Sequence, residues 1–368
     1  MAVDSGDQLD SPAGWRVVSG THAVTAVTFG SVYAFSALFP GLAEEFDASR
    51  GQIAFVFALA AFCYYGLGAI AGQLADRWPV RRMVVIAIVV MVLGYVAAAF
   101  SQSLLGLYNA YSIAGGVGIG MSYVPALGAV QSWFVRRRAL ASGIAIAGLG
   151  VGTLVLPALT GVLIPVLGWR GCLLLLAGIV AVVGGAAAVF VRQREMSRSA
   201  AGIPDEEPPA LRFARPRDVW RRRSFPLFYF VVVLGSFCVF IPYVHLVPAA
   251  QDLGLSLEAG TSLIAVIGVG NVIGRFVLVG LGDLIPARYL LAILTAAVAG
   301  SFVFWSFADN YVMLAVFAFV FGAAYGGCVG STPSLLSSCS VLNASAQCWG
   351  IFTREWGSRP SSVRRLRA

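Results

Sequence analysis

Residues 83–101 read MVVIAIVVMVLGYVAAAFS and contain no charged side chain. An α-helix needs about 20 apolar residues to cross the roughly 30 Å hydrocarbon core of a bilayer, and this run meets that length. Similar apolar runs, separated by short polar segments, cover residues 17–41, 52–74, 104–131, 139–165, 170–191, 225–249, 259–282, 289–308 and 311–335. The sequence therefore predicts an all-α integral membrane protein with about ten membrane-spanning helices.

The composition supports a membrane protein and argues against a soluble one. Hydrophobic residues make up 59% of the chain and charged residues 11%, whereas about a quarter of the residues in soluble domains are charged. The runs are longer than the strands of membrane barrels and lack their alternation, so helices are expected. The formal charge of +8 does not indicate nucleic acid, because the arginines are not interleaved with exposed aromatic residues.

The arginines predict the orientation of the chain, because arginine is enriched in cytoplasmic loops. Arg77, Arg81 and Arg82 follow the second run, an arginine triplet at 136–138 precedes the fifth, and the segment 192–223 follows the sixth. The loops on the opposite side are acidic. We expect a multi-pass protein of the plasma membrane with a cytoplasmic N-terminus, and no cleavable signal peptide because the first residues lack a basic segment.

The long polar segment after the sixth run divides the chain into two halves. Asp76-Arg-Trp-Pro-Val-Arg81 follows the second run, and Asp283-Leu-Ile-Pro-Ala-Arg288 follows the eighth, at the same position of the second half. Such repetition is typical of duplicated transporters, which bind substrate between their halves; a chance match in tight loops is the alternative. The expected parts are a polar cytoplasmic N-terminus (1–16), a six-helix half (17–191), a cytoplasmic linker (192–224), a four-helix half (225–335) and a polar tail (336–368).

The sequence Gly72-Gln-Leu-Ala-Asp76-Arg77, with Arg81 after it, resembles the loop signature of the major facilitator superfamily. The resemblance implies a helical bundle of two pseudo-symmetric halves. It also implies a role for this loop in the cytoplasmic gate, and the matching loop with Asp283 and Arg288 would act in the same way.

Residues 123–152, which include Arg138 and Gly143, resemble the signature of the fourth and fifth helices in monocarboxylate transporters and oxalate/formate antiporters. The resemblance begins at residue 14 and ends near 336. After that point the tail contains no apolar run long enough to span a bilayer, so we expect helices eleven and twelve of the family to be missing. We interpret the tail as the product of a shifted reading frame or a truncated gene.

Arg275 is the one charge predicted to lie deep inside a span. Such an arginine costs about 2.5–3.5 kcal/mol on insertion scales, and no carboxylate lies at a comparable depth in any predicted span. An anionic substrate held by the guanidinium would compensate for this cost; a snorkelling or water-solvated structural arginine is the alternative. Asn271 precedes Arg275 by one helical turn, so its amide can reach the same substrate.

Other polar groups in the spans are weaker candidates. The family resemblance implies that Tyr123 and Tyr325 complete the substrate site, with Tyr33 as a further candidate; packing of these rings between helices is the alternative. His22 and His245 are candidate proton sites because histidine titrates near neutral pH, although structural roles are also consistent with their positions.

The chain departs from the animal members of that family at two polar positions. Asn271 occupies the place of an aspartate, and Ser36 and Ala37 occupy the stretch where a lysine is found. A co-transported proton would therefore need another carrier. All 25 basic residues are arginine, and we find no nucleophile–base pair, metal-ligand cluster or phosphate-binding loop. The sequence therefore predicts neither an enzyme nor a cofactor.

Together these features predict a secondary transporter that moves a small monocarboxylate such as lactate, pyruvate or formate, or exchanges carboxylates, by alternating access. Its expected partners are the lipid bilayer, a carboxylate anion and a co-transported proton. Two alternatives remain open at this point: a membrane sensor or partner subunit without transport, including a non-functional truncated product, and a carrier of the same superfamily for another small organic solute.

Overall fold

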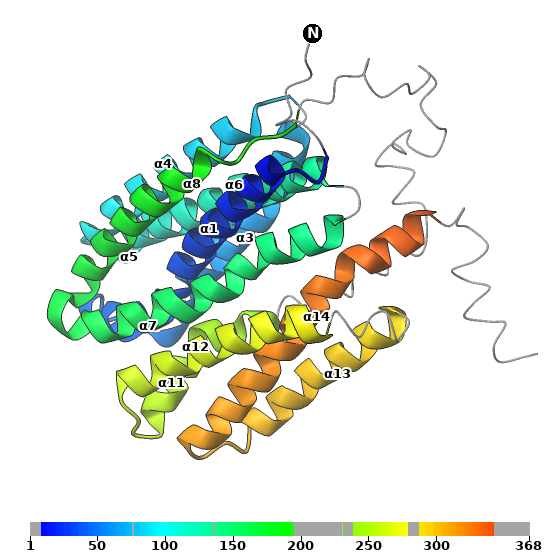
Figure 1. Ribbon diagram of the computed structural model, residues 1–368. Coiled ribbons are helices and arrows are strands. Elements are labelled where there is room, and N and C mark those ends of the chain that lie inside the picture. The colour runs from blue at the N-terminus through cyan, green and yellow to red at the C-terminus, as the bar shows by residue number, and fades with distance from the viewer. Residues whose placement is uncertain are drawn as a thin grey trace, which may run out of the picture. The chain divides into compact units, whose positions relative to one another are not determined.

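The computed structural model describes residues 9–75, 77–134, 137–194, 230, 238–278 and 287–341. Within these ranges the regular structure is helical, and no strand occurs (Figure 1). Nearly all of the described residues belong to one compact unit, formed by 1–196 and 239–330. The second unit, 197–238 and 331–368, contributes only Phe230, Cys238 and the last turns of the final helix to the described residues.

The helical segments follow one another along the chain with short connections. Three of them are single π-helical turns, labelled η. In order they are α1 (Pro12–Tyr33), α2 (Phe35–Glu45), α3 (Arg50–Leu74), α4 (Val80–Ala99), α5 (Leu104–Leu107), η2 (Tyr108–Ser112), α6 (Ile113–Trp133), α7 (Arg138–Ile179), η3 (Val180–Gly184), α8 (Gly185–Ala188), α11 (Ile241–Asp252), α12 (Leu257–Ile273), η4 (Gly274–Leu278), α13 (Ala287–Trp305) and α14 (Tyr311–Val341).

Seven helical segments of the described chain are long and apolar enough to cross a bilayer. The all-helical membrane fold is thus confirmed, whereas the expected number of ten spans is not. The predicted runs 139–165 and 170–191 lie in one segment, Leu140–Ala188. This segment turns at Gly168, whose φ of 65° lies in the left-handed region that favours glycine. Of the run 225–249, residues 230 and 238–249 are described, and most of these belong to α11.

The last described helix is longer than expected. The sequence predicts that the tenth span ends at 335 and that a polar tail follows, but α14 continues to Val341. Residues 334–341 contain neither proline nor glycine, so nothing in this stretch interrupts the helical hydrogen bonding. The remainder of the predicted tail, and nearly all of the predicted linker, lie outside the described residues.

Large apolar side chains lie on the outside of the helices. The exposed fractions are 77% for Phe62, 70% for Phe100, 80% for Val166 and 72% for Phe307. Soluble monomers rarely expose apolar surface on this scale, whereas lipid tails cover it without penalty. The interior instead holds hydroxyl groups: Thr25 and Thr28 in α1 donate to backbone carbonyls of their own helix. This distribution suits a helical bundle whose solvent is lipid.

Hydrogen bonds gather the N-terminus and the ends of α6 and α8 at one end of the first half. The Asp10 amide donates to the Trp133 carbonyl, and the Arg137 amide donates to Asp10 Oδ1. The indole of Trp133 donates to the carbonyl of Arg192 at 2.9 Å, and the amide of Arg194 donates to the Ser132 hydroxyl. Three segments that the sequence assigns to the cytoplasm therefore lie together. We call this group the Asp10 cluster; it consists of Asp10, Ser132, Trp133, Arg137, Arg192 and Arg194.

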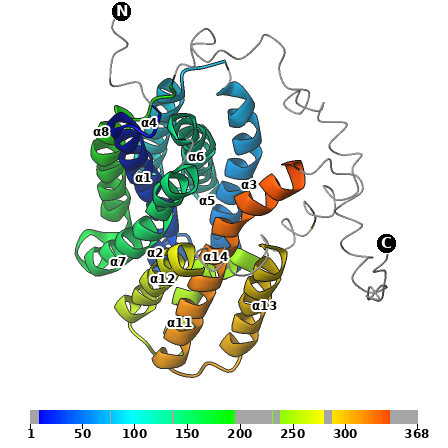
Figure 2. The same cartoon turned by 45° about the vertical axis from the view of Figure 1, so that its right-hand side comes forward.

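Glycines bring helices into backbone contact. Figures 1 and 2 show α1 beside α7 and α14 beside α13. A methyl group at Gly148 would meet the His22 carbonyl, and one at Gly152 would meet the Ala26 carbonyl, so α1 approaches α7 more closely than alanine allows. Gly270 and Gly274 of α12 and η4 make the same kind of contact with α14, at Phe319 and Ala323.

The second half contacts the first mainly through α12, which packs along α7. A methyl group at Gly268 would lie 2.6 Å from the Leu154 amide nitrogen, and one at Gly150 would lie 2.5 Å from a methyl carbon of Val272. Elsewhere α11 packs against α2. The helix that carries Asn271 is therefore fixed against both α7 and α14.

The close approach of α1 to α7 predicts the effect of one methyl group. Gly152→Ala places a carbon against the backbone of Ala26, so we expect a loss of about 1–3 kcal/mol of stability. Thermal unfolding of the full chain in detergent should show this loss of stability as a lower Tm. Gly178→Ala in the same helix is the matched control, because a Cβ there meets nothing within 4 Å. Equal Tm values for the two variants would contradict the proposed contact.

Candidate functional site

Arg275 lies in η4, the π-helical turn that directly follows α12. The helix begins at a cap, where Ser256 Oγ accepts a hydrogen bond from the Ala259 amide at 3.2 Å. It then runs without a break to the turn Gly274–Leu278. Short π-helical turns occur frequently at functional sites, because they redirect a side chain without ending the helix. Here the turn carries the guanidinium group.

The Arg275 side chain is buried, with an exposed fraction of 6%, and Asn271 is fully buried. The Nε group of Arg275 donates a hydrogen bond of 2.8 Å to Asn271 Oδ1. The predicted pairing of these two residues one turn apart is therefore present, but it uses only one of the five guanidinium N–H donors. The asparagine fixes the orientation of the arginine and leaves the outer edge of the guanidinium for another partner.

Several donors around this pair have no acceptor. Among the residues that the structure describes, Arg275 Nη2, Asn271 Nδ2 and the hydroxyl of Tyr243 are buried without a hydrogen-bond partner. Leaving a buried donor unpaired costs about 1–3 kcal/mol, and more for a charged group. The ion pairs of the described residues do not include Arg275. A cation with unpaired donors beside it suits an anion with several acceptor oxygens, such as a carboxylate.

The three predicted site tyrosines lie around this cation. The Arg275 charge interacts electrostatically with the phenols of Tyr123, Tyr325, Tyr243 and Tyr33. Tyr123 comes from α6 and Tyr33 from α1, in the first half of the chain, whereas Tyr325 comes from α14 in the second half. The fold therefore brings Tyr33, Tyr123, Tyr325, Asn271 and Arg275 together.

A chain of aromatic contacts connects these tyrosines. The ring of Tyr325 stacks on Phe321, which meets Tyr243 at 6.2 Å between centroids. Tyr243 stacks on Tyr33 at 4.2 Å with an angle of 9° between the planes. From Tyr33 the contacts continue through Phe29 to Tyr123. Rings from both halves thus form one connected row that includes the three predicted site tyrosines.

Tyr243 is the residue that the sequence-based prediction missed. It lies within the segment Pro242-Tyr-Val-His245 of α11. In this segment the sequence indicated His245 as the candidate, because histidine titrates near neutral pH. A single tyrosine in an apolar helix does not reveal which face it occupies. In the sequence, only its position directly after Pro242 distinguishes Tyr243. Its contact with Tyr33 depends on how α11 packs.

The two histidines lie in different surroundings. His22 Nδ1 forms a hydrogen bond of 2.7 Å with the Ile144 carbonyl, which ties α1 to α7. This contact supports the structural role that the sequence left open for His22. His245 is partly buried in α11 and interacts electrostatically with Arg50, so it lies toward the other end of the bundle from the Asp10 cluster. Neither observation tests proton transfer.

Part of the predicted gate motif falls outside the described chain. Asp76 and Asp283 are not among the described residues, and neither are the side chains of Arg138 and Arg288. Arg77 and Arg81 are exposed.

The two glycines of these motifs are not in close contact with other helices. A methyl group at Gly72 would meet Val124 at 3.6 Å, an ordinary distance, and one at Gly143 would meet nothing within 4 Å. Packing against the described residues therefore does not require glycine at either position.

An ion pair joins the two halves at the end opposite the Asp10 cluster. Arg50 Nη1 and Nη2 donate to the two carboxylate oxygens of Asp252, at 2.7 and 2.6 Å. Arg50 begins α3, directly after the capping box formed by Ser49 and Gln52, and Asp252 ends α11. The hydrogen bonds from Arg50 hold the pKa of Asp252 below its ordinary value. The sequence indicated an acidic outer loop here but no partner for it.

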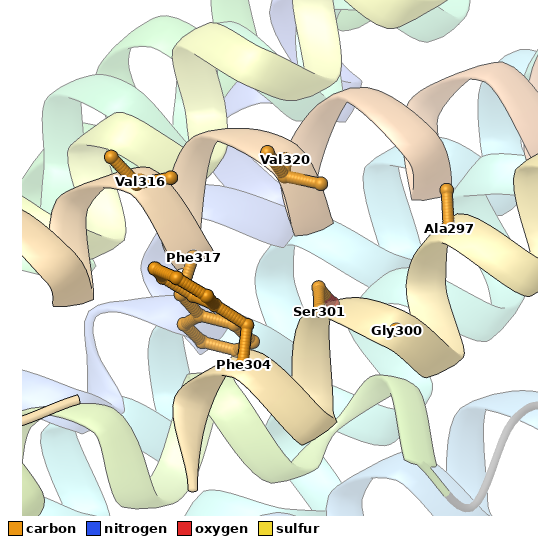
Figure 3. Close-up of a pocket in the computed structure, with 7 residues that line it drawn as sticks. All are labelled: Ala297, Gly300, Ser301, Phe304, Val316, Phe317 and Val320. Carbon is orange, nitrogen blue, oxygen red and sulfur yellow. The ribbon is translucent and has the colours of Figure 1, made fainter. Parts of the chain in front are cut away.

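A separate cavity of about 270 Å³ lies between α13 and α14 (Figure 3). Its lining comes from Ala297, Gly300, Ser301, Phe304, Val316, Phe317 and Val320. The Ser301 hydroxyl already donates to the Val298 carbonyl. The lining contains no charged side chain, so this cavity does not suit an anion.

Comparison with known proteins identifies the family. The model of the Major Facilitator Superfamily matches residues 21–357. This chain belongs to that superfamily. The resemblance seen in the gate loop and the helical fold is therefore confirmed, and the superfamily and its named relatives are transporters rather than enzymes.

The most similar relatives include monocarboxylate transporters. Monocarboxylate transporter 11 of Homo sapiens is 32% identical over 289 residues, which cover 78% of this chain and 60% of that protein. Monocarboxylate transporter 13 of Rattus norvegicus is 26% identical over 319 residues, covering 86% of this chain and 73% of that protein. The chain spans about 60% of the length of the first of these relatives.

Solved structures support the fold. A bacterial homologue of the human lysosomal transporter Spinster, in an inward-facing and unoccupied conformation, has a TM-score of 0.64 at 17% identity and covers 92% of this chain and 81% of its own. A D-xylose–proton symporter has a TM-score of 0.60 at 14% identity, with coverage of 88% and 82%. The helical arrangement is therefore that of major facilitator transporters.

The ion pair between the halves predicts a measurable coupling. Both side chains are more than half exposed, so solvent screening limits the pair to about 0.2–1 kcal/mol. In a double-mutant cycle of thermal stability, Arg50→Ala and Asp252→Ala should lose less together than the sum of their separate losses. Because its pKa is lowered in the folded state, Asp252 contributes above its unfolded-state pKa of about 3.9, and the coupling should vanish as pH falls through the folded-state pKa.

The matched control is Arg170→Ala with Asp252→Ala. Arg170 forms its own ion pair, with Glu45 in the first half, so it should show no coupling to Asp252. Strict additivity for Arg50 and Asp252 at neutral pH would contradict the pairing.

Proposed function

We propose that this chain carries a small monocarboxylate across the plasma membrane, or exchanges carboxylates, by alternating access. The observation that carries the proposal is the buried guanidinium of Arg275, whose Nη2 donor is unpaired among the described residues beside the unpaired amide of Asn271. The names of the relatives support the same substrate class, since both relatives are called monocarboxylate transporters. A single cation with two adjacent donor groups matches one carboxylate.

The roles of the residues follow from this geometry. The Nη edge of Arg275 would bind the carboxylate oxygens, and the amide of Asn271 would donate to the same anion. Tyr123 and Tyr325 would complete the polar wall from opposite halves, with Tyr33 beside them. Because the site draws on both halves, rocking one half against the other would expose it to either side in turn.

The gate residues are proposed from the motif. Asp76, Arg77 and Arg81, with Asp283 and Arg288 in the second half, would close the cytoplasmic side. Arg50 with Asp252 would close the opposite side, because this pair must part before the halves separate there. Charge placement supports a cytoplasmic N-terminus: the loops that gather with Asp10 are those rich in arginine.

Substitution of Arg275 tests the proposal. Removal of the guanidinium leaves the carboxylate without its cation, which costs about 2–5 kcal/mol for a buried charge pair. We therefore expect Arg275→Ala to reduce initial uptake of lactate or pyruvate into proteoliposomes by at least about 30-fold. Uptake is measured with the full chain reconstituted at equal protein density.

Arg16→Ala, which removes an exposed arginine of α1, is the control and should leave uptake unchanged. Undiminished carboxylate uptake by Arg275→Ala would contradict the proposal that Arg275 binds the carboxylate. Binding of carboxylate by the unmodified chain without any flux would instead favour a sensor.

A further inference from the structure

Tyr243 is held rigidly between the two halves of the bundle. Its ring lies parallel to that of Tyr33 at 4.2 Å, and the edge-to-face contact with Phe321 fixes its other side. The side chain is fully buried. Offset stacking and edge-to-face contacts of this kind fix the position of a ring. These contacts restrict rotation of the side chain, so packing fixes the direction in which the hydroxyl points.

The hydroxyl of Tyr243 has no hydrogen-bond partner within the described chain. Other buried tyrosines differ: the hydroxyl of Tyr95 donates to Ser31 Oγ at 3.2 Å, and that of Tyr111 donates to the Val32 carbonyl at 3.1 Å. Buried tyrosine hydroxyls normally find a partner, so an unpaired one calls for an explanation. The ring of Tyr243 stacks on Tyr33 and contacts Phe321, which in turn stacks on Tyr325. Tyr243 therefore lies among the tyrosines of the proposed carboxylate site, and the Arg275 charge interacts electrostatically with its phenol.

The donors near Tyr243 divide into two sets. Arg275 and Asn271 come from one helix and its π-helical turn, and their unpaired N–H groups are sufficient for the two oxygens of a carboxylate. Tyr243 comes from a different helix, α11, and is neutral. A phenol can donate a hydrogen bond to a keto oxygen, and it can either donate to a hydroxyl or accept from one, whereas arginine can only donate.

Resting on the proposed function, we propose that Tyr243 is a specificity-determining residue whose hydroxyl hydrogen-bonds an oxygen on the carbon next to the substrate's carboxylate. The carboxylate binds Arg275 and Asn271, and the neighbouring oxygen binds Tyr243. An acid without that oxygen leaves the phenol unpaired. The site would therefore discriminate against the unsubstituted acid, because that acid has no group that can hydrogen-bond the buried phenol.

The variant Tyr243→Phe tests this assignment, because it removes the hydroxyl and keeps the ring that stacks on Tyr33. We expect uptake of lactate and pyruvate into proteoliposomes, as kcat/KM, to fall by about two- to tenfold, the range of one neutral hydrogen bond. Uptake of propionate, which has the same carbon chain without the extra oxygen, should not change. The preference for lactate over propionate should therefore fall by the same factor.

Tyr111→Phe is the matched control, since it removes a buried hydroxyl that is bonded within the first half of the chain. It should leave the ratio of lactate to propionate uptake unchanged. Competition with the unmodified protein gives a second test that does not depend on any variant folding: 2-hydroxy and 2-oxo acids should inhibit lactate uptake at several-fold lower concentrations than unsubstituted acids of equal length.

The outcomes separate this proposal from the one on which it rests. If uptake depends on Arg275 but Tyr243→Phe changes lactate and propionate equally, or changes neither, the role of Tyr243 is overturned and carboxylate transport stands. Equal inhibition by substituted and unsubstituted acids would overturn it as well. If the unmodified chain takes up no carboxylate, both proposals fail.

Discussion

The buried guanidinium of Arg275 is the constraint on which the account of this protein depends. A charge inside a membrane protein must be compensated, because lipid and packed side chains do not solvate it. Within the described residues, Arg275 has one hydrogen bond, to Asn271, and takes part in none of the ion pairs. The Nη2 group remains without an acceptor there. Such a site suits the anion proposed above, and the chain belongs to a superfamily whose named relatives are transporters.

The close packing of α12 explains how the site stays in place. Gly270 and Gly274 let α12 and η4 approach α14, and Gly268 lets α12 approach α7. A methyl group at Gly326 would collide with the carbonyl of Asn271, so glycine on α14 is needed directly beside the site pair. These contacts join the site helix to helices of both halves. The exposed ion pair of Arg50 with Asp252 adds little energy, which suits the gate proposed for it.

Much of this arrangement could be predicted from the sequence. Long apolar runs fix the helical membrane fold, and the absence of a matching carboxylate in the spans singles out Arg275 and, one turn before it, Asn271. The family resemblance added Tyr123 and Tyr325. What could not be predicted depends on packing between helices: which face Tyr243 presents, the partner of Asp252 two hundred residues away in the chain, and the continuation of α14 to Val341. The expected number of ten spans is not confirmed; the turn at Gly168 lies between the predicted runs 139–165 and 170–191, within one helical segment.

The most direct test of the central claim is whether the site recognises a carboxylate rather than a small polar solute. The purified full chain, in detergent, would be unfolded thermally with increasing concentrations of lactate or of its neutral amide, lactamide. A ligand that binds only the folded state raises Tm, and the rise grows with the logarithm of its concentration above Kd. We predict that lactate raises Tm and that lactamide, which has the same shape but no charge for Arg275, does not. Equal shifts with both compounds, or no shift with either, would contradict the account.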